Sequence, residues 1–264
     1  MIIEQNISNL TEKYKSNDTN HVVILDLFDK EFIKKCEEEF LTIDESKFFR
    51  YSDPYFEYEK YSMNDMSSIP ENLSKLFSYI HSPEFVKIVE KVTGIEGLIT
   101  DEKRWGGGLH MTKPGGYLSI HKDFNVLPDS YINNRQMLRC VNLIGYLTDE
   151  DQTENNGHLE FWKDGESEKI CNSFNNWVIF DTRDCYHGHP NPFTGEKPRM
   201  SIASYYYIEQ EIDQEKWSST EYLKLPWMED SEEYSTKRIE RSNPKIRYKN
   251  IYSQIERKKE RNKI

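Results

Sequence analysis

The chain has 264 residues, a length that fits one domain with appendages or at most two domains. Its 46 acidic residues outnumber its 35 basic residues, and the formal net charge of −11 repels phosphate backbones, so we expect no general nucleic-acid binding. The mean hydropathy is −0.85, and no apolar run approaches the roughly 20 residues that cross a bilayer, so we expect no membrane span.

The cysteines and the N-terminus bear on the cellular compartment. The four cysteines lie far apart, without the paired spacing of a zinc ribbon. The N-terminus lacks a long apolar segment followed by small residues, so we expect no secretory signal. These features predict a cytoplasmic protein with reduced thiols at Cys36, Cys140, Cys171 and Cys185.

The first third of the chain predicts a strand and two helices. Residues 21–28, HVVILDLF, form a compact β-type run. Asp29 suits a helix N-cap, and apolar residues then recur at helical spacing. Ser82 and Pro83 mark the start of a second helix, whose apolar stripe ends at Gly94. We interpret both apolar stripes as core contacts.

From about residue 97, short β-rich runs alternate with turn residues, a pattern typical of a jelly roll. The runs are GGLHMT, YLSIHKDF, LRCVNLIGYL, HLEFW, NWVIF and RMSIASYYYI. The sequence therefore predicts an α+β fold with a double-stranded β-helix (jelly-roll) core, N-terminal helices packed on one face and a C-terminal extension. We divide the chain into a supporting strand and helices (1–96), the jelly-roll domain (97–210) and a polar extension (211–264).

The end of the extension is basic. From residue 237 onward it holds 11 basic and three acidic residues. We interpret this stretch as a solvated, partly helical tail, and a contact with an acidic partner or another subunit is the alternative. The sequence carries no signal of the oligomeric state.

Three polar residues in the predicted jelly roll indicate a metal site. His121 and Asp123 are two residues apart on a strand, so an imidazole and a carboxylate share one face. His187, in the segment DCYHGHP, supplies a second imidazole, and His189 on the same face is the alternative. Two histidines and one carboxylate leave open coordination positions and suit non-haem Fe(II) that must also bind O2 and a co-substrate.

Arg199 and Ser201 begin another β-rich run and share a strand face, where a guanidinium beside a hydroxyl matches a carboxylate. The order His-x-Asp, distal His and Arg-x-Ser resembles the Fe(II)/2-oxoglutarate-dependent oxygenases, and most closely their prolyl-4-hydroxylase-like branch. Residues 139–147, 156–160 and 177–181 resemble that branch's central strand, its Gly-Gly-x-Leu turn and the strand before the distal histidine.

The resemblance, which covers about residues 100–208, implies a role for each motif residue. A catalytic centre would comprise Arg199 and the three iron ligands, which are His121, Asp123 and His187. The far carboxylate of 2-oxoglutarate would pair with Arg199, in a cofactor pocket that also includes Ser201, Tyr146, Asn142 and Leu159. The implied cofactors are Fe(II), 2-oxoglutarate as co-substrate and O2, with ascorbate as a further reductant.

Several residues depart from the family pattern or leave alternatives open. His158 stands where the second glycine of the turn is expected, and it either faces the substrate or lies exposed. His110 lies in the cleft or has a structural role, and Tyr146 is a cofactor contact or an ordinary core tyrosine. Cys185 is interpreted as a packing residue.

The function implied by the resemblance is that of a prolyl-4-hydroxylase-like hydroxylase. It would insert oxygen into a C–H bond of a peptidyl or small-molecule substrate and release succinate and CO2. Two alternatives are a non-catalytic, cupin-like jelly-roll binding protein and a metal-dependent barrel enzyme that does not use 2-oxoglutarate. The Arg199 and Ser201 pair favours the hydroxylase, because a non-catalytic jelly roll has no need of it.

Overall fold

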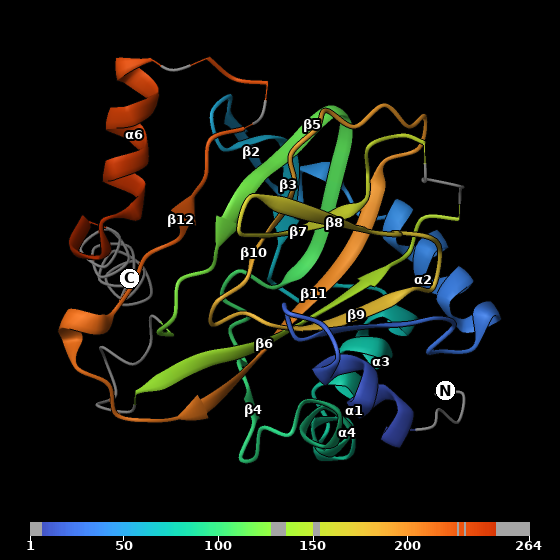
Figure 1. Cartoon of the computed structure of the whole chain (residues 1–264). Coiled ribbons are helices and arrows are strands. Elements are labelled where there is room, and N and C mark those ends of the chain that lie inside the picture. Colours follow the sequence, from blue (N-terminus) through green and yellow to red (C-terminus); the bar gives the residue numbers. More distant parts are fainter. Residues whose placement is uncertain (1–6, 128–135, 150–153, 226, 230, 247–264) are drawn as a thin grey trace, which may run out of the picture.

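The computed structural model describes residues 7–127, 136–149, 154–225, 227–229 and 231–246 (Figure 1). Its helices are α1 (Ile7–Lys15), α2 (Lys30–Leu41), α3 (Glu71–Ile80), α4 (Pro83–Thr93) and α6 (Glu232–Ser242), with single 3-10 turns at Glu45–Lys47 and Gln214–Lys216. Its strands are β1 (His21–Ile24), β2 (Phe49–Asp53), β3 (Glu57–Met63), β4 (Ile99–Thr100), β5 (Gly108–Lys122), β6 (Met137–Tyr146), β7 (Leu159–Lys163), β8 (Glu166–Ile170), β9 (Trp177–Asp181), β10 (Tyr186–His189), β11 (Arg199–Glu209) and β12 (Glu221–Tyr222).

The strands form one antiparallel sheet that curls into a nearly closed, jelly-roll-like barrel (Figure 1). Neighbours follow the order β1-β9-β6-β11-β5-β10-β7-β8, and β2, β3, β4 and β12 pair beside this path. The long strand β5 joins the two halves of the barrel. One of its edges pairs with β11 and then β10, and the other with β3 and then β12. The predicted α+β jelly-roll class is confirmed.

The N-terminal helices cover one face of the barrel, as predicted (Figure 1). Asp29 caps α2, since its carboxylate accepts the backbone N–H of Phe32 at 2.9 Å. Ser82 caps α4 in the same manner, and Gly94 ends that helix with a left-handed φ of 73°. The apolar stripes of the helices pack in one core with strand residues, which include Val141, Leu143, Trp177, Ile179, Ile202 and Tyr206.

Trp177 of β9 is one of the largest fully buried side chains of this core. Its indole meets the ring of Phe28 edge-on, with centroids 4.8 Å apart, and its Nε1 donates to Asn175 at 3.1 Å. Gly145 lies directly opposite on β6. A Cβ at that position would come within 2.5 Å of the Trp177 ring. Interiors are close-packed, so the indole needs a glycine here.

Several observed elements go beyond the sequence-based expectations. The hairpin β2–β3 lies in residues 49–63, where charged and aromatic residues obscure the alternation of a strand, and β3 pairs along β5. The helices α1 and α3, and the polar strand β8, also lie outside those expectations. The C-terminal extension adds β12 next to β5 and the helix α6 beside it (Figure 1). The basic tail after residue 246 lies outside the described residues, and the three domain boundaries stay a prediction.

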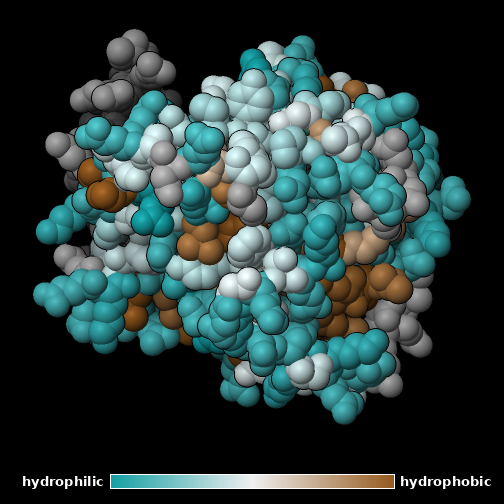
Figure 2. Space-filling model, turned by 45° about the horizontal axis from the view of Figure 1, so that its top comes forward, coloured by the Kyte–Doolittle hydropathy of each residue, from teal (hydrophilic) through white to brown (hydrophobic). Residues whose placement is uncertain are grey.

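Hydrophilic residues cover most of one face of the molecule (Figure 2). Figure 2 shows a face on which apolar residues gather in separate patches among polar ones. Within the part of the chain that the structure describes, no helix combines the length and apolar character of a membrane span. All four cysteines are free thiols, and a cytoplasmic location stays a prediction.

Gly145→Ala should lower the free energy of unfolding by about 1–3 kcal/mol, because the added methyl group overpacks the Trp177 indole. Urea denaturation followed by tryptophan fluorescence and circular dichroism measures the loss. The same substitution in a Trp177→Phe background should cost less, since the clashing ring atoms are then absent. An equal cost in both backgrounds would contradict this packing argument.

Candidate functional site

A cavity of about 1070 Å³ opens between the two halves of the barrel. Its wall includes side chains from β3, β5, β6, β10 and β11, and from the C-terminal extension. Most of the residues predicted from the sequence lie in this wall, namely His121, Asp123, Asn142, Leu159, His187, Arg199 and Ser201. The fold therefore brings together side chains that are up to 80 positions apart in the sequence.

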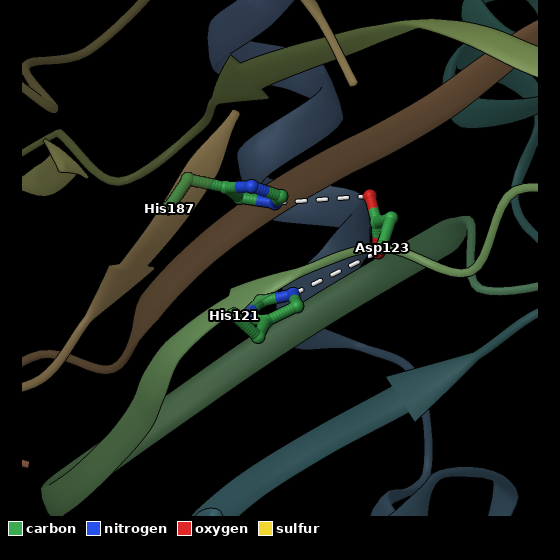
Figure 3. A group of neighbouring side chains, drawn as sticks. All are labelled: His121, Asp123 and His187. Atoms are coloured by element: carbon green, nitrogen blue, oxygen red, sulfur yellow. Dashed lines mark ion pairs between the residues drawn. The ribbon is translucent and has the colours of Figure 1, made fainter. Parts of the chain in front are cut away.

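His121, Asp123 and His187 point toward one another from two neighbouring strands (Figure 3). His121 of β5 lies directly opposite His187 of β10, and Asp123 follows immediately after β5. Nε2 of His121 is 3.7 Å from Oδ1 of Asp123, and Nε2 of His187 is 3.8 Å from Oδ2. All three side chains are buried, and one ligand atom from each lies within 4.8 Å of the others.

The two imidazoles are turned so that one nitrogen of each faces the carboxylate. Nδ1 of His121 lies 2.9 Å from the carbonyl of Ser119, and Nδ1 of His187 lies 3.2 Å from that of Cys185. A carbonyl only accepts, so each Nδ1 donates its proton and each Nε2 keeps a lone pair directed inward. Burial lowers the pKa of His121, and burial with the neighbouring His121 lowers that of His187 to about 4. Both rings are neutral at pH 7, which is the form that binds a metal ion.

Arg199, at the start of β11, brings a buried positive charge to the same cavity. Its Nε donates to the carbonyl of Gly157 at 2.6 Å, and its guanidinium carbon lies 5.0 Å from the Tyr146 ring centroid. Among the described residues, no carboxylate comes within ion-pair distance of this guanidinium. A buried cation is costly without an anion, so the site is built for an acidic ligand. Ser201 lies on the same strand face.

The remaining pocket residues predicted from the sequence lie as follows. Asn142 and Leu159 are buried and line the cavity. Tyr146 is buried beside Arg199 and opposite Ser201 in the strand register, but the cavity wall does not include it.

The other candidate histidines separate into two groups. His110 and His189 are both in the cavity wall, and His189 is not one of the three clustered ligands. His158 is buried, and its Nε2 lies 3.2 Å from Glu160 rather than in the cavity wall. Cys185 packs with apolar residues of β6, β7, β8 and β9, as expected.

Sequence reasoning missed Arg139. Its Nη1 lies 3.3 Å from Oδ1 of Asp123, and its side chain is almost completely buried. In a regular strand, Arg139 and Asn142 would point to opposite faces of β6. Tyr206 of β11 pairs with Val141, however, and the next residue, Tyr207, pairs with Arg139, so Cys140 is an extra residue without a partner on β11. This β-bulge turns Arg139 into the cavity. No local pattern in the sequence indicates the bulge.

The contribution of the C-terminal extension was also missed. Tyr222 of β12 pairs with His121, and the two ring centroids lie 5.6 Å apart. The Tyr222 hydroxyl donates to Glu57 at 2.9 Å, and Arg241 of α6 donates to Glu57 and to Asp53, each at 3.2 Å. Burial opposes ionisation of Glu57, but Lys60 and Arg241 lower its pKa to about 2. The extension is therefore fastened by ion pairs over one side of the cavity.

Comparison with known families identifies the central segment. Residues 107–207, from the start of β5 to near the end of β11, match the 2OG-Fe(II) oxygenase superfamily. The matched segment contains the three clustered ligands and Arg199. No curated protein matches the chain.

Solved structures with a similar fold include two prolyl hydroxylases. The prolyl-4-hydroxylase of Pseudomonas putida has a TM-score of 0.55 and 11% identity, over 78% of this chain and 100% of that chain. A prolyl hydroxylase of Trichoplax adhaerens, in complex with a hypoxia inducible factor peptide fragment, has a TM-score of 0.54 and 14% identity, over 78% and 94%.

A third similar structure has a different ligand. HygX of Streptomyces hygroscopicus, with nickel, 2-oxoglutarate and hygromycin B bound, has a TM-score of 0.53 and 14% identity. The alignment covers 77% of this chain and 88% of that chain. At these identities the three likenesses establish a common fold.

The metal-free protein should lose stability as the pH falls from about 6.5 toward 3. Burial, with Lys60 and Arg199 nearby, lowers the pKa of His110 to about 3. Unfolding exposes this ring, which then takes up a proton near pH 6.5, so the stabilisation is complete above that pH and is lost below it. This histidine alone should contribute roughly 1 kcal/mol per pH unit.

Urea denaturation at pH 7.5, 6.5 and 5.5 measures this dependence. His110→Gln, which does not titrate, should show a shallower loss of unfolding free energy than the unmodified protein. Equal slopes for the two proteins would show that folding does not lower the pKa of His110.

Proposed function

Because the chain belongs to the 2OG-Fe(II) oxygenase superfamily, we propose that it is a hydroxylase that oxidises a C–H bond and releases succinate and CO2. One observation carries the proposal. A His-Asp-His metal site shares a cavity with a buried arginine that has no carboxylate partner among the described residues. This combination, together with the family match, argues against the non-catalytic binding protein considered from the sequence.

His121, Asp123 and His187 are the proposed iron ligands. Their donor set, two neutral imidazoles and one carboxylate, is the set that non-haem Fe(II) takes when it must leave positions open for other ligands. When bound, Fe(II) supplies the oxygen-activating chemistry that no side chain provides. The rings need no deprotonation before binding, because burial lowers their pKa. The carbonyls of Ser119 and Cys185 fix the orientation of both rings.

Arg199 is the proposed anchor for the far carboxylate of 2-oxoglutarate. The fork of a guanidinium binds a carboxylate through two hydrogen bonds, and its Nε is already held by Gly157, which fixes the direction of the fork. Ser201 offers a hydroxyl on the same face, while Asn142 and Leu159 line the adjoining wall. Tyr146 acts on this pocket through Arg199, against which its ring lies.

The proposed substrate is a peptidyl or small-molecule substrate bound between the iron site and the C-terminal extension. The two prolyl hydroxylases of similar fold support a prolyl side chain. HygX, with hygromycin B bound, supports the second candidate, a polar small molecule. The cavity wall itself favours the second candidate, because polar side chains dominate the part made by β3, its following loop and the extension, including Glu57, Lys60, Ser62, Asn64, Asp65, Ser219, Thr220 and Arg241.

Asp123→Ala should abolish two iron-dependent signals, both of which can be measured without knowing the substrate. The unmodified protein should develop a visible charge-transfer band when Fe(II) and 2-oxoglutarate are added without oxygen. It should also release succinate slowly in air when ascorbate is present. Asp181→Ala, which removes a carboxylate paired with Arg183 outside the cavity wall, should leave both signals unchanged. Retention of the band and of succinate release in Asp123→Ala would overturn the proposed function.

Arg199→Ala should mainly weaken the binding of 2-oxoglutarate. Loss of charge-assisted hydrogen bonds of about 1.5–3 kcal/mol corresponds to roughly a 10- to 100-fold higher requirement for the keto acid. Anaerobic titration of the charge-transfer band with 2-oxoglutarate measures this shift, and Arg199→Lys should recover part of the affinity. Binding of Mn(II) without 2-oxoglutarate should be unchanged. An unaltered 2-oxoglutarate titration would remove Arg199 from the proposed pocket.

A further inference from the structure

We propose that Arg139 is a positioning residue that restrains the Asp123 carboxylate to offer a metal ion one oxygen. This inference rests on the iron site of the proposed function. Nη1 of Arg139 lies 3.3 Å from Oδ1 of Asp123, and the two side chains are 1% and 8% exposed. An ion pair so well shielded from water is screened little by solvent, so the guanidinium exerts a strong, directed pull on one carboxylate oxygen.

The guanidinium is held from both faces and along its edge. Its central carbon lies 3.6 Å from the ring centroid of Phe124 and 3.6 Å from that of Tyr205. Nη2 donates to the carbonyl of Trp105 at 2.7 Å and to the Tyr207 hydroxyl at 3.0 Å. These contacts fix both the plane and the rotation of the group. Arg139 therefore sets the position of Asp123, because it has no room to follow a carboxylate that turns.

Tyr205 adds a second restraint on the same carboxylate. The Tyr205 hydroxyl donates a hydrogen bond to the Asp123 carboxylate. The ring that stacks on Arg139 thus also carries a hydroxyl bonded to Asp123. Arg139, Tyr205 and Asp123 therefore form one compact unit.

An irregularity in the backbone of β6 brings this arginine to the cavity. Cys140 and Val141 both belong to the core beneath the helices, although they are adjacent on the strand. The bulge at Cys140 is what places Arg139 on the cavity side with Asn142. A regular strand would turn the Arg139 side chain to the opposite face from Asn142, away from Asp123.

Binding of the metal ion through one oxygen of Asp123 matters because the ion has a limited number of coordination positions. A carboxylate that turns to bind through both oxygens takes a position needed by 2-oxoglutarate or O2. A carboxylate that turns away weakens metal binding. Outer contacts of this kind typically change metal affinity by about 10- to 100-fold. Arg139 would therefore affect both the affinity for the metal and the spectrum of the bound complex.

The test compares Arg139→Met, Arg139→Lys and Tyr205→Phe with the unmodified protein. Mn(II) binding, followed by the loss of the free-ion EPR signal, should weaken about 10- to 100-fold in Arg139→Met. Arg139→Lys keeps the charge without the fork and should recover part of this loss. Tyr205→Phe keeps the stacking ring and should weaken binding only a few-fold. In the anaerobic Fe(II) and 2-oxoglutarate complex, the charge-transfer band of Arg139→Met should shift.

Arg183→Met is the matched control, since it breaks an arginine–aspartate pair outside the cavity wall. It should leave Mn(II) affinity and the band unchanged. The inference fails if Arg139→Met binds Mn(II) as the unmodified protein does with an unshifted band, whatever its thermal stability. If Arg139→Met does not fold, the inference also fails if both Arg139→Lys and Tyr205→Phe bind Mn(II) with unchanged affinity. Failure of the unmodified protein to bind Mn(II) would instead overturn the proposed iron site.

Discussion

The antiparallel pairing of β5 with β10 is the constraint on which the rest of the site depends. It places His121 opposite His187, and the chain leaves β5 one residue later, so that Asp123 turns back toward both rings. Side chains alternate with a period of two, so a shift of β10 by one residue would turn His187 to the other face of the sheet, away from His121. The stability of this pairing therefore determines whether the three side chains meet at all.

The strand β5 pairs with different strands near its two ends, and each pairing brings different side chains to the cavity. Near residue 110, β5 pairs with β11, and this contact carries Arg199 and Ser201 to the cavity. Near residue 121, it pairs with β10 and β12, which bring His187 and Tyr222. A single continuous strand thus fixes the separation between the metal ligands and the buried guanidinium. Rigid elements hold such groups more accurately than loops do.

The grouping of the proposed ligands and Arg199 could be predicted from the sequence, because these residues lie on strands or, for Asp123, directly after one. The two-residue spacing of His121 and Asp123, and of Arg199 and Ser201, is enough to place each pair on one face. Arg139 could not be predicted in this way, since the bulge at Cys140 reverses the alternation at that point. Tyr222, Glu57 and Arg241 meet only through pairing between distant segments, and nothing in their local sequence indicates which strand they join.

The cavity is made from two parts of the chain, the segment that matches the family and the segments on either side of it. The proposed iron ligands and Arg199 all fall within residues 107–207, whereas Glu57, Tyr222 and Arg241 come from either side of that segment. Substitutions in the flanking segments can reshape the entrance without moving a ligand atom. The groups that face an entering molecule from β3 and the extension are thus separate from the clustered ligands, so the match to the family leaves the identity of that molecule open.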